Sequence, residues 1–250
     1  MNVLRARGIS KRFSGIVALD AVDIDVDEGE RVGLIGPNGA GKTTFFNCVL
    51  GVVRADGGTV ELHGEDIGRL PVHERARRGI GRTFQRLELF PEITVRDHLL
   101  VADRVHRRTG RFLEDLVGLG RPRRDEIARC DDVLDLLGLG HLAEEPVERL
   151  SLGQGRLVEV GRALMTQPQL LLLDEPSSGL SVEETEEMAF WIQDIRTLLG
   201  ITVLMVEHDM SLVSAVSDRV LALNYGRPLA LGTAREVQDH PDVVKAYLGG

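Results

Sequence analysis

The segment Gly36-Pro37-Asn38-Gly39-Ala40-Gly41-Lys42-Thr43 constrains the fold of this chain more than any other. It fits the pattern G-x-x-x-x-G-K-[ST] and follows the short apolar run Arg31 to Ile35, which predicts a strand. Glycines let successive backbone N–H groups turn inward around an anion, and a helix starting near Lys42 adds the positive end of its dipole. The order of strand, loop and helix therefore predicts a phosphate-binding loop.

The residues of this loop have distinct expected tasks. We expect Lys42 to reach the β- and γ-phosphates of a nucleotide and the Thr43 hydroxyl to bind Mg²⁺. A glycine-rich turn without a ligand is the alternative, but the match of the whole pattern between a strand and a helix argues against it. The expected phosphate-binding residues are Gly36, Pro37, Asn38, Gly39, Ala40, Gly41, Lys42, Thr43 and Thr44.

A second apolar run, Leu170 to Leu173, delivers two adjacent carboxylates, Asp174 and Glu175, at its end. We expect Asp174 to bind Mg²⁺ and Glu175 to polarise a water molecule for attack on the γ-phosphate. Strand ends meet solvent and tolerate acidic residues, which is the alternative interpretation. The presence of a phosphate loop in the same chain makes this alternative the weaker interpretation.

Composition and charge exclude several other classes of protein. The chain has 250 residues and a net charge of −9, from 30 basic and 39 acidic side chains, which suits a single domain with one large core. No apolar run approaches the roughly 18 residues of a membrane span, and no secretory signal opens the sequence. We therefore expect a cytoplasmic location. The acidic balance argues against nucleic acid as a partner.

The chain divides into an α/β part and a helical part. Strand patterns include Val22 to Val26, Thr59 to Leu62, Ile80 to Phe84 and Thr202 to Val206. From about residue 95 to residue 153 helical spacing replaces them, which predicts a helical subdomain inserted into a core with a mixed sheet. The arginine-rich stretch 104–124 favours a solvated arm over a patch that binds lipid headgroups. Cys48 and Cys130 are expected to be small buried side chains, since they have no disulfide or metal-ligand spacing.

A further segment narrows the choice among phosphate-loop proteins, namely Leu150-Ser151-Leu152-Gly153-Gln154 before a helical pattern. With it the chain resembles the ATP-binding cassette family, whose LSGGQ signature precedes the acidic strand end by about this interval. Gln85 matches the Q-loop of that family, His208 its switch histidine and 177–181 its D-loop. The resemblance covers nearly the whole chain, and it implies a RecA-like P-loop NTPase core. A P-loop phosphotransferase would have no use for the signature, the Q-loop or the switch histidine.

The resemblance implies roles for the matched residues. In the family two cassettes close head to tail, so Ser151, Gly153 and Gln154 would contact the nucleotide that the other chain holds. Gln85 would sense Mg²⁺ and the attacking water. His208 would hydrogen-bond the γ-phosphate and orient that water. Phe13 matches the aromatic residue that stacks on adenine. The implied ligands are ATP and Mg²⁺, with Thr43, Gln85 and Asp174 around the metal.

Two positions depart from the pattern of the family. Leu152 replaces the first glycine of the signature, and a side chain that points away from the nucleotide would be tolerated there. Ser181 stands where the family often has aspartate, which weakens an expected contact across the dimer. The run Ser181-Val182-Glu183-Glu184 also reads as a capping box that opens the next helix.

Four runs resemble the ATP-binding subunits of branched-chain amino acid importers: 70–80, 82–85, 207–210 and 241–249. The resemblance implies an ATP-hydrolysing subunit, peripheral on the cytoplasmic face of the membrane. Its partners would be a second cassette, identical or different, two permease subunits and an extracytoplasmic solute-binding protein. A groove beside Gln85 would accept a helix of the permease. A cassette of a urea or amide importer, another ABC system, or a soluble ABC ATPase in translation or DNA repair are the alternatives.

Overall fold

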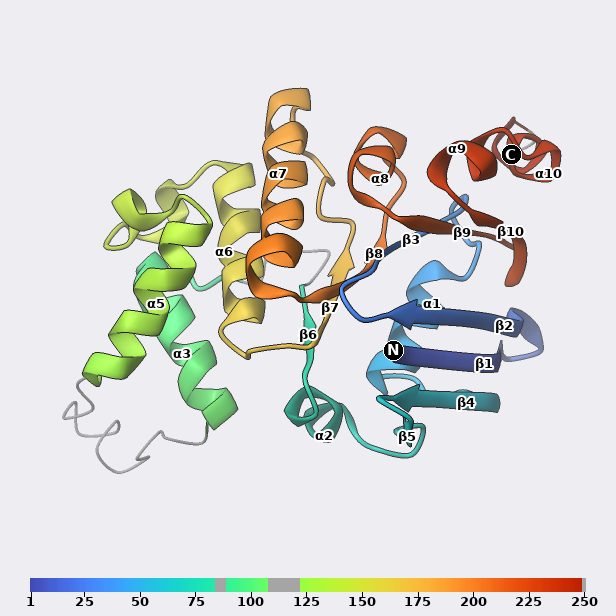
Figure 1. The fold of residues 1–250 in the computed structure, drawn as a ribbon, viewed down its shortest axis with the longest axis horizontal. Coiled ribbons are helices and arrows are strands. Elements are labelled where there is room, and N and C mark those ends of the chain that lie inside the picture. The colour runs from blue at the N-terminus through green and yellow to red at the C-terminus, as the bar shows by residue number, and fades with distance from the viewer. Residues whose placement is uncertain (84–88, 108–121, 249–250) are drawn as a thin grey trace.

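The expected strand, loop and helix lie within a six-stranded sheet. The computed structural model describes residues 1–83, 89–107 and 122–248. In the order β10-β9-β3-β8-β7-β6, the strands from β9 to β6 pair in parallel and β10 runs antiparallel to β9. The predicted mixed sheet with a parallel core is confirmed (Figure 1). The strands are β3 (Arg31–Ile35), β6 (Ile80–Arg82), β7 (Leu170–Asp174), β8 (Thr202–Val206), β9 (Arg219–Asn224) and β10 (Arg227–Gly232).

The central strands of this sheet are buried on both faces, as their apolar runs predict. Leu170 and Leu172 belong to one hydrophobic core, whereas Leu171 and Leu173 belong to the core on the opposite face. Successive strand residues point to opposite faces, so an uninterrupted leucine run suits a strand with two covered faces. The expected strand from Ile80 is shorter than predicted, because it ends at Arg82. Phe84 lies outside the described residues.

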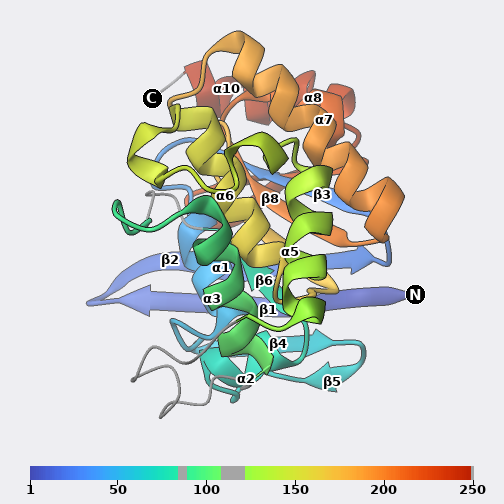
Figure 2. The same ribbon diagram turned by 90° about the vertical axis from the view of Figure 1, so that its left-hand side faces the viewer.

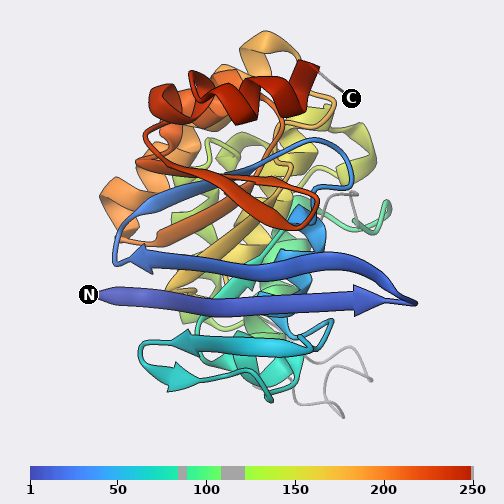
Figure 3. The same ribbon diagram turned by 90° about the vertical axis from the view of Figure 1, so that its right-hand side faces the viewer.

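A second, antiparallel sheet has the strand order β2-β1-β4-β5 (Figure 3). In β1, the side chains of Leu4, Ala6 and Ile9 are fully buried. The pairing with β2 shifts register between Ala6 and Ile9, around Gly8, which has a φ of +60°. This irregularity moves the buried positions out of strict alternation, and the sequence pattern predicts no strand at residues 2–13 for that reason. The strands are β1 (Asn2–Phe13), β2 (Ile16–Asp27), β4 (Gly57–Leu62) and β5 (Glu65–Asp66).

Helix α1 (Lys42–Leu50) lies between the two sheets and contacts β1, β2 and β8. Phe45 and Phe46 are fully buried, and Cys48 is 2% exposed, as expected of a small buried side chain. Burying two phenylalanines contributes roughly 2–3 kcal/mol each to folding. The helix that follows the phosphate loop is therefore held from both sides.

Most of the residues described in 95–153 are helical, and they lie on the side of the molecule that faces the viewer in Figure 2. The buried Asp103 of α3 joins two helices there, since Arg107 donates to it from α3 and Arg129 from α5, at 2.8 and 2.7 Å. Cys130 is fully buried. The bounds of an inserted subdomain remain a prediction. The elements on this side are α2 (Val72–Arg77), α3 (Val95–Arg107), α5 (Arg124–Leu136), 3-10 turns at Gly140–Leu142 and Val147–Arg149, and α6 (Leu152–Leu164).

Helices of the C-terminal half complete the cover of the large sheet. Ser181 caps the first of them: its hydroxyl accepts the backbone N–H of Glu184, whose carboxylate accepts that of Ser181, so the predicted capping box is confirmed. None of the helices in the described ranges is both long and apolar enough to cross a membrane. The helices are α7 (Val182–Leu199), α8 (Met210–Val216), α9 (Ala234–Gln238) and α10 (Pro241–Leu248).

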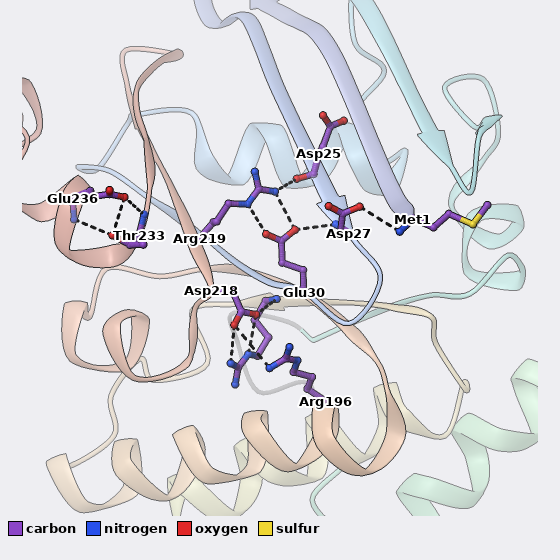
Figure 4. A network of polar contacts seen from close by, with 10 residues as sticks. Met1, Asp25, Asp27, Glu30, Arg196, Asp218, Arg219, Thr233 and Glu236 are labelled. Carbon is purple, nitrogen blue, oxygen red and sulfur yellow. Dashed lines mark hydrogen bonds and ion pairs between the residues drawn. The ribbon is translucent and has the colours of Figure 1, made fainter.

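A polar network joins the two sheets at the amino ends of β3 and β9 (Figure 4). Arg219 of β9 donates to the Glu30 carboxylate and, at 2.7 Å, to the carbonyl oxygen of Asp25 in β2. Asp218 accepts from Arg31. Burial raises the pKa of Asp218, but the hydrogen bonds and charge of Arg31 outweigh it, so this pKa is lowered. These contacts fix the edge of the large sheet that lies opposite its carboxyl-terminal strand ends.

Candidate functional site

The carboxyl ends of four parallel strands bring the expected chemical groups to one edge of the large sheet. Gly36 follows β3, Thr83 follows β6, Asp174 ends β7 and Glu207 follows β8. Backbone hydrogen bonds continue the register past the strand ends: Thr83 N–H donates to Leu172 O at 3.0 Å and Glu207 N–H to Leu34 O at 3.2 Å. Ligands of open α/β sheets bind at this edge.

Two glycines of the phosphate loop, Gly36 and Gly41, lie close against neighbouring backbone. A Cβ atom on Gly36 would lie 2.2 Å from the carbonyl oxygen of Leu223, and one on Gly41 would lie 2.5 Å from that of Ala18. Gly41 has a φ of +104° and precedes α1 without a side-chain cap. The loop therefore needs glycine at both positions, and the first N–H groups of α1 are left for a ligand rather than for a capping side chain.

Lys42 is the first residue of α1 and is 6% exposed. Its Nζ donates to the carbonyl oxygens of Gly36, at 2.6 Å, and Pro37, at 3.2 Å. Burial lowers the pKa of this ammonium, and the carboxylates of Glu175, Asp174 and Glu207 oppose that change. The structure thus places Lys42 within the field of three acidic side chains.

The remaining loop residues differ in exposure. Asn38, Gly39 and Thr43 are exposed, whereas Ala40 is buried. The Ala40 carbonyl oxygen accepts the N–H of Gly226, which ties the loop to the turn between β9 and β10. The buried Ala40 therefore anchors the exposed residues of the loop. The exposed Thr43 has a hydroxyl that is open to a ligand. Pro37 and Thr44 are partly exposed.

Asp174 is buried at the end of β7, where its backbone N–H donates to Thr83 Oγ1 at 3.2 Å. Burial raises the pKa of its carboxyl group, and the ion pair with Arg82, whose Nη2 lies 3.3 Å away, opposes this rise. The sequence run around Arg82 marked a branch of the family, but it gave no reason to place this cation beside Asp174. A buried carboxylate that pairs with an arginine is suited to bind a metal ion in place of that arginine.

Glu175 and His208 lie on adjacent loops. Glu175 has a φ of +49°, uncommon for a residue with a side chain, and its backbone N–H donates to Val206 O at 2.9 Å. The hydrogen bond joins the start of its loop to the end of β8, two residues before His208. The side chain of His208 is 57% exposed. Its ring is therefore free to meet a ligand from the solvent side.

The signature segment forms the start of α6. Ser151 caps the helix and shares a capping box with Gln154. The carboxylate of Glu184, from α7, accepts the Ser151 hydroxyl and the Gly153 N–H, each at 3.3 Å. The donors of the signature therefore hold an anionic group in this structure. In the described part of the chain, these donors make no hydrogen bond to residues 36–43, so one chain does not bring the two motifs together.

Leu152 and Phe13 are both partly exposed in the structure. Leu152 is 40% exposed, and its Cδ2 lies 3.0 Å from where a Cβ atom on Gly179 would be. Phe13, at the end of β1, is 45% exposed, with Lys11 Nζ 5.4 Å from its ring centroid. Val17, across the hairpin, is 39% exposed. An aromatic face near the solvent is compatible with stacking.

Gln85, expected to contact Mg²⁺, lies outside the described residues, as does most of the arginine-rich stretch, 108–121. Tyr247 of α10 is a residue that sequence reasoning missed as part of the site. Burial raises the pKa of its phenol, and a hydrogen bond from the Gly36 N–H acts in the opposite direction. The run Ala246-Tyr247-Leu248 indicates a resemblance to the branched-chain amino acid importers. It does not predict this contact between Tyr247 and the phosphate loop.

Two protein-family models match separate segments of the chain. Residues 19–178 match the family model described as ABC transporter, and residues 227–250 match one described as branched-chain amino acid ATP-binding cassette transporter. The second match contains α10 and therefore Tyr247. Both the core of the site and its C-terminal neighbour thus have counterparts in known proteins.

Full-length relatives and solved structures agree with these matches. The chain is 42% identical to the high-affinity branched-chain amino acid transport ATP-binding protein BraF of Pseudomonas aeruginosa, over 99% of this chain and 98% of the relative. It is 41% identical to LivG of Escherichia coli, with the same coverage. A cassette of an ABC transporter in its ADP conformation superposes with a TM-score of 0.89 at 32% identity, covering 100% of both chains, and a nucleotide-free cassette with 0.86. The chain belongs to the ATP-binding cassette transporter family and is a nucleotide-binding ATPase of that family.

Proposed function

We propose that this chain is the ATP-hydrolysing subunit of an importer for branched-chain or related amino acids. The observation that carries the proposal is the match of the C-terminal segment 227–250 to the branched-chain amino acid model, beside relatives of the same named activity over almost the full length. In this role the chain lies peripherally on the cytoplasmic face of the membrane. It acts with two permease subunits and an extracytoplasmic solute-binding protein.

The phosphate loop is proposed to hold the phosphates of ATP. The glycine positions that exclude a side chain support a backbone cradle, and the Lys42 ammonium would exchange the carbonyl oxygens of Gly36 and Pro37 for the β- and γ-phosphates. Thr43, Asp174 and Gln85 are the proposed Mg²⁺ ligands, of which Gln85 lies outside the described residues. A hydroxyl, a carboxylate and substrate phosphates form a suitable ligand set, and Mg²⁺ bound there would neutralise developing phosphate charge. Phe13 is proposed to stack on the adenine.

Hydrolysis is assigned to the loops that follow β7 and β8. Glu175 is proposed to accept a proton from the attacking water, and His208 to donate a hydrogen bond to the γ-phosphate and orient that water. The hydrogen bond of Glu175 N–H to Val206 O supports this division of tasks, because it holds the two loops side by side. Burial raises the pKa of the Asp174 carboxyl group, and a bound cation would lower it.

The signature is proposed to complete the site of a second cassette. Ser151, Gly153 and Gln154 would contact the γ-phosphate held by the partner, with the two cassettes arranged head to tail. The contact of Ser151 and Gly153 with the Glu184 carboxylate supports this, since it indicates that these donors suit an anion. The start of α6 adds the favourable end of a helix dipole.

A groove is proposed as the docking site of the permease. Its volume is about 470 Å³, and it lies among α2, β6, α3 and α6, next to Thr83 and thus close to the Q-loop in sequence. Val101 and Val105 of α3 line it and are 50% and 76% exposed. An apolar groove of this size suits the apolar face of a short helix.

Copurification tests this proposal. We expect the tagged chain, expressed in its own cell, to recover two hydrophobic membrane subunits. Val101→Glu with Val105→Glu should lose them, because a docked permease helix would bury both charges. Leu198→Glu, at a position on α7 that is 66% exposed, is the matched control and keeps them. Recovery of ribosomes or DNA in place of membrane subunits would reject transport as the function. Recovery of permeases for urea or amides would change the proposed substrate from amino acids to urea or amides.

A further inference from the structure

Glu207 is a fully buried carboxylate at the centre of the site, directly after β8. Its Oε1 accepts the backbone N–H of Ser177 at 2.8 Å. Its Oε2 accepts those of His208 and Asp209, at 2.9 and 3.2 Å. One side chain thus receives hydrogen bonds from two separate loops.

These hydrogen bonds account for the burial of the charge. A carboxylate removed from water is costly unless hydrogen bonds or opposite charges replace its hydration, and charge-assisted N–H contacts are the strong kind. Both oxygens of Glu207 are used. An amide in the same place offers one acceptor oxygen, and its NH₂ group would face an N–H that also needs an acceptor.

The two loops that meet at Glu207 carry the residues proposed for hydrolysis. Ser177 stands two residues after Glu175, in a turn where Ser178 N–H donates to Glu175 O at 3.1 Å. His208 follows Glu207 directly, and its ring Nδ1 lies 3.7 Å from Glu207 Oε2. Movement of either loop would therefore strain or break a hydrogen bond to the shared carboxylate.

We propose that Glu207 is a positioning residue that holds the loop of Glu175 and the loop of His208 in one fixed relation for ATP hydrolysis. The proposal rests on the tasks proposed above for those two residues. Glu207 itself touches neither the phosphates nor the water in this scheme. It acts through the backbone of Ser177, His208 and Asp209. The position of this backbone fixes the points from which the Glu175 and His208 side chains extend.

A purely structural role for Glu207 would give a different result in kinetics. Loss of positioning lowers kcat and leaves the binding of ATP to the phosphate loop unchanged, whereas a folding defect lowers the amount of active protein and its melting temperature. In addition, Glu207 and His208 would act as one unit. In a variant that already lacks the His208 side chain, replacing Glu207 would then lower kcat only a little further.

The test measures ATPase kinetics of the purified transporter that contains the full chain. We expect Glu207→Gln to lower kcat at least about tenfold and to leave the KM for ATP within about twofold, with little further loss when it is combined with His208→Ala. Glu236→Gln is the matched control, because Glu236 also accepts a backbone N–H, from Thr233 at 2.8 Å (Figure 4), but at an exposed helix start and with no proposed role in ATP binding or hydrolysis.

Some outcomes overturn the proposal while the proposed function stands. These are an unchanged kcat in Glu207→Gln, a loss of activity no greater than the loss of folded protein, or a full additional loss in the double variant. If Glu207→Gln does not fold, Glu207→Asp keeps the charge on a shorter side chain, and the same split between kcat and KM is expected of it. A wild-type complex without ATPase activity would instead count against the proposed function.

Discussion

Glu175→Gln is expected to abolish ATP turnover while ATP still binds and the two cassettes still close. The amide cannot accept the proton of the attacking water, and loss of a general base costs about 10²–10⁴-fold in rate. The backbone at this position has a φ of +49°, and Gln has the same stem as Glu, so the loop is not expected to change. The measurement is phosphate release by the purified complex, together with ATP-dependent closure by crosslinking between Ser151 and the phosphate loop of the partner.

Glu186→Gln is the control for that experiment. It removes the same charge from an exposed position on α7 and should leave turnover unchanged. Hydrolysis at the wild-type rate by Glu175→Gln would contradict the assignment of the base. Loss of ATP binding by the same variant would show that Glu175 acts on the nucleotide rather than on the water.

Lys42→Ala is expected to remove most of the affinity for ATP and, with it, nearly all turnover. Lys42 is 6% exposed, so we do not expect a water molecule to replace an ammonium that is proposed to contact two phosphates. Hydrogen bonds to charged groups contribute about 1.5–3 kcal/mol, which corresponds to a loss of about 10–100-fold in affinity. Equilibrium binding of a fluorescent ATP analogue measures this directly.

Lys42→Arg separates charge from shape in the same assay. A planar guanidinium fits a narrow nest less well than a compact ammonium, so we expect arginine to restore little binding. Lys245→Ala, an exposed lysine on α10, is the control and should bind ATP normally. Normal affinity in Lys42→Ala would contradict the proposed phosphate site.

Sequence patterns predict the local features of this site well, because short-range chemistry determines them. The start of α1 at Lys42 and the capping box of Ser181 each depend on neighbours a few residues away. The strand before Asp174 follows from an apolar run that two cores bury. Such features need no knowledge of distant contacts.

Contacts between distant segments could not be predicted in the same way. The Arg82 cation beside Asp174 depends on the pairing of β6 with β7, and the Glu184 carboxylate at the signature depends on how α7 meets α6. The three N–H groups that meet Glu207 come from loops whose proximity is a property of the sheet. Strand β1 was missed for a local reason, since the register shift around Gly8 breaks its alternation.

Uptake of labelled amino acids into vesicles tests the central proposal most directly. The vesicles hold the complete complex, with its solute-binding protein outside and ATP inside, and a complex with Lys42→Ala serves as the control. We expect leucine, isoleucine or valine to accumulate only with ATP and only with wild-type Lys42. If a panel of amino acids shows no ATP-dependent accumulation while the complex hydrolyses ATP, amino acid import is contradicted.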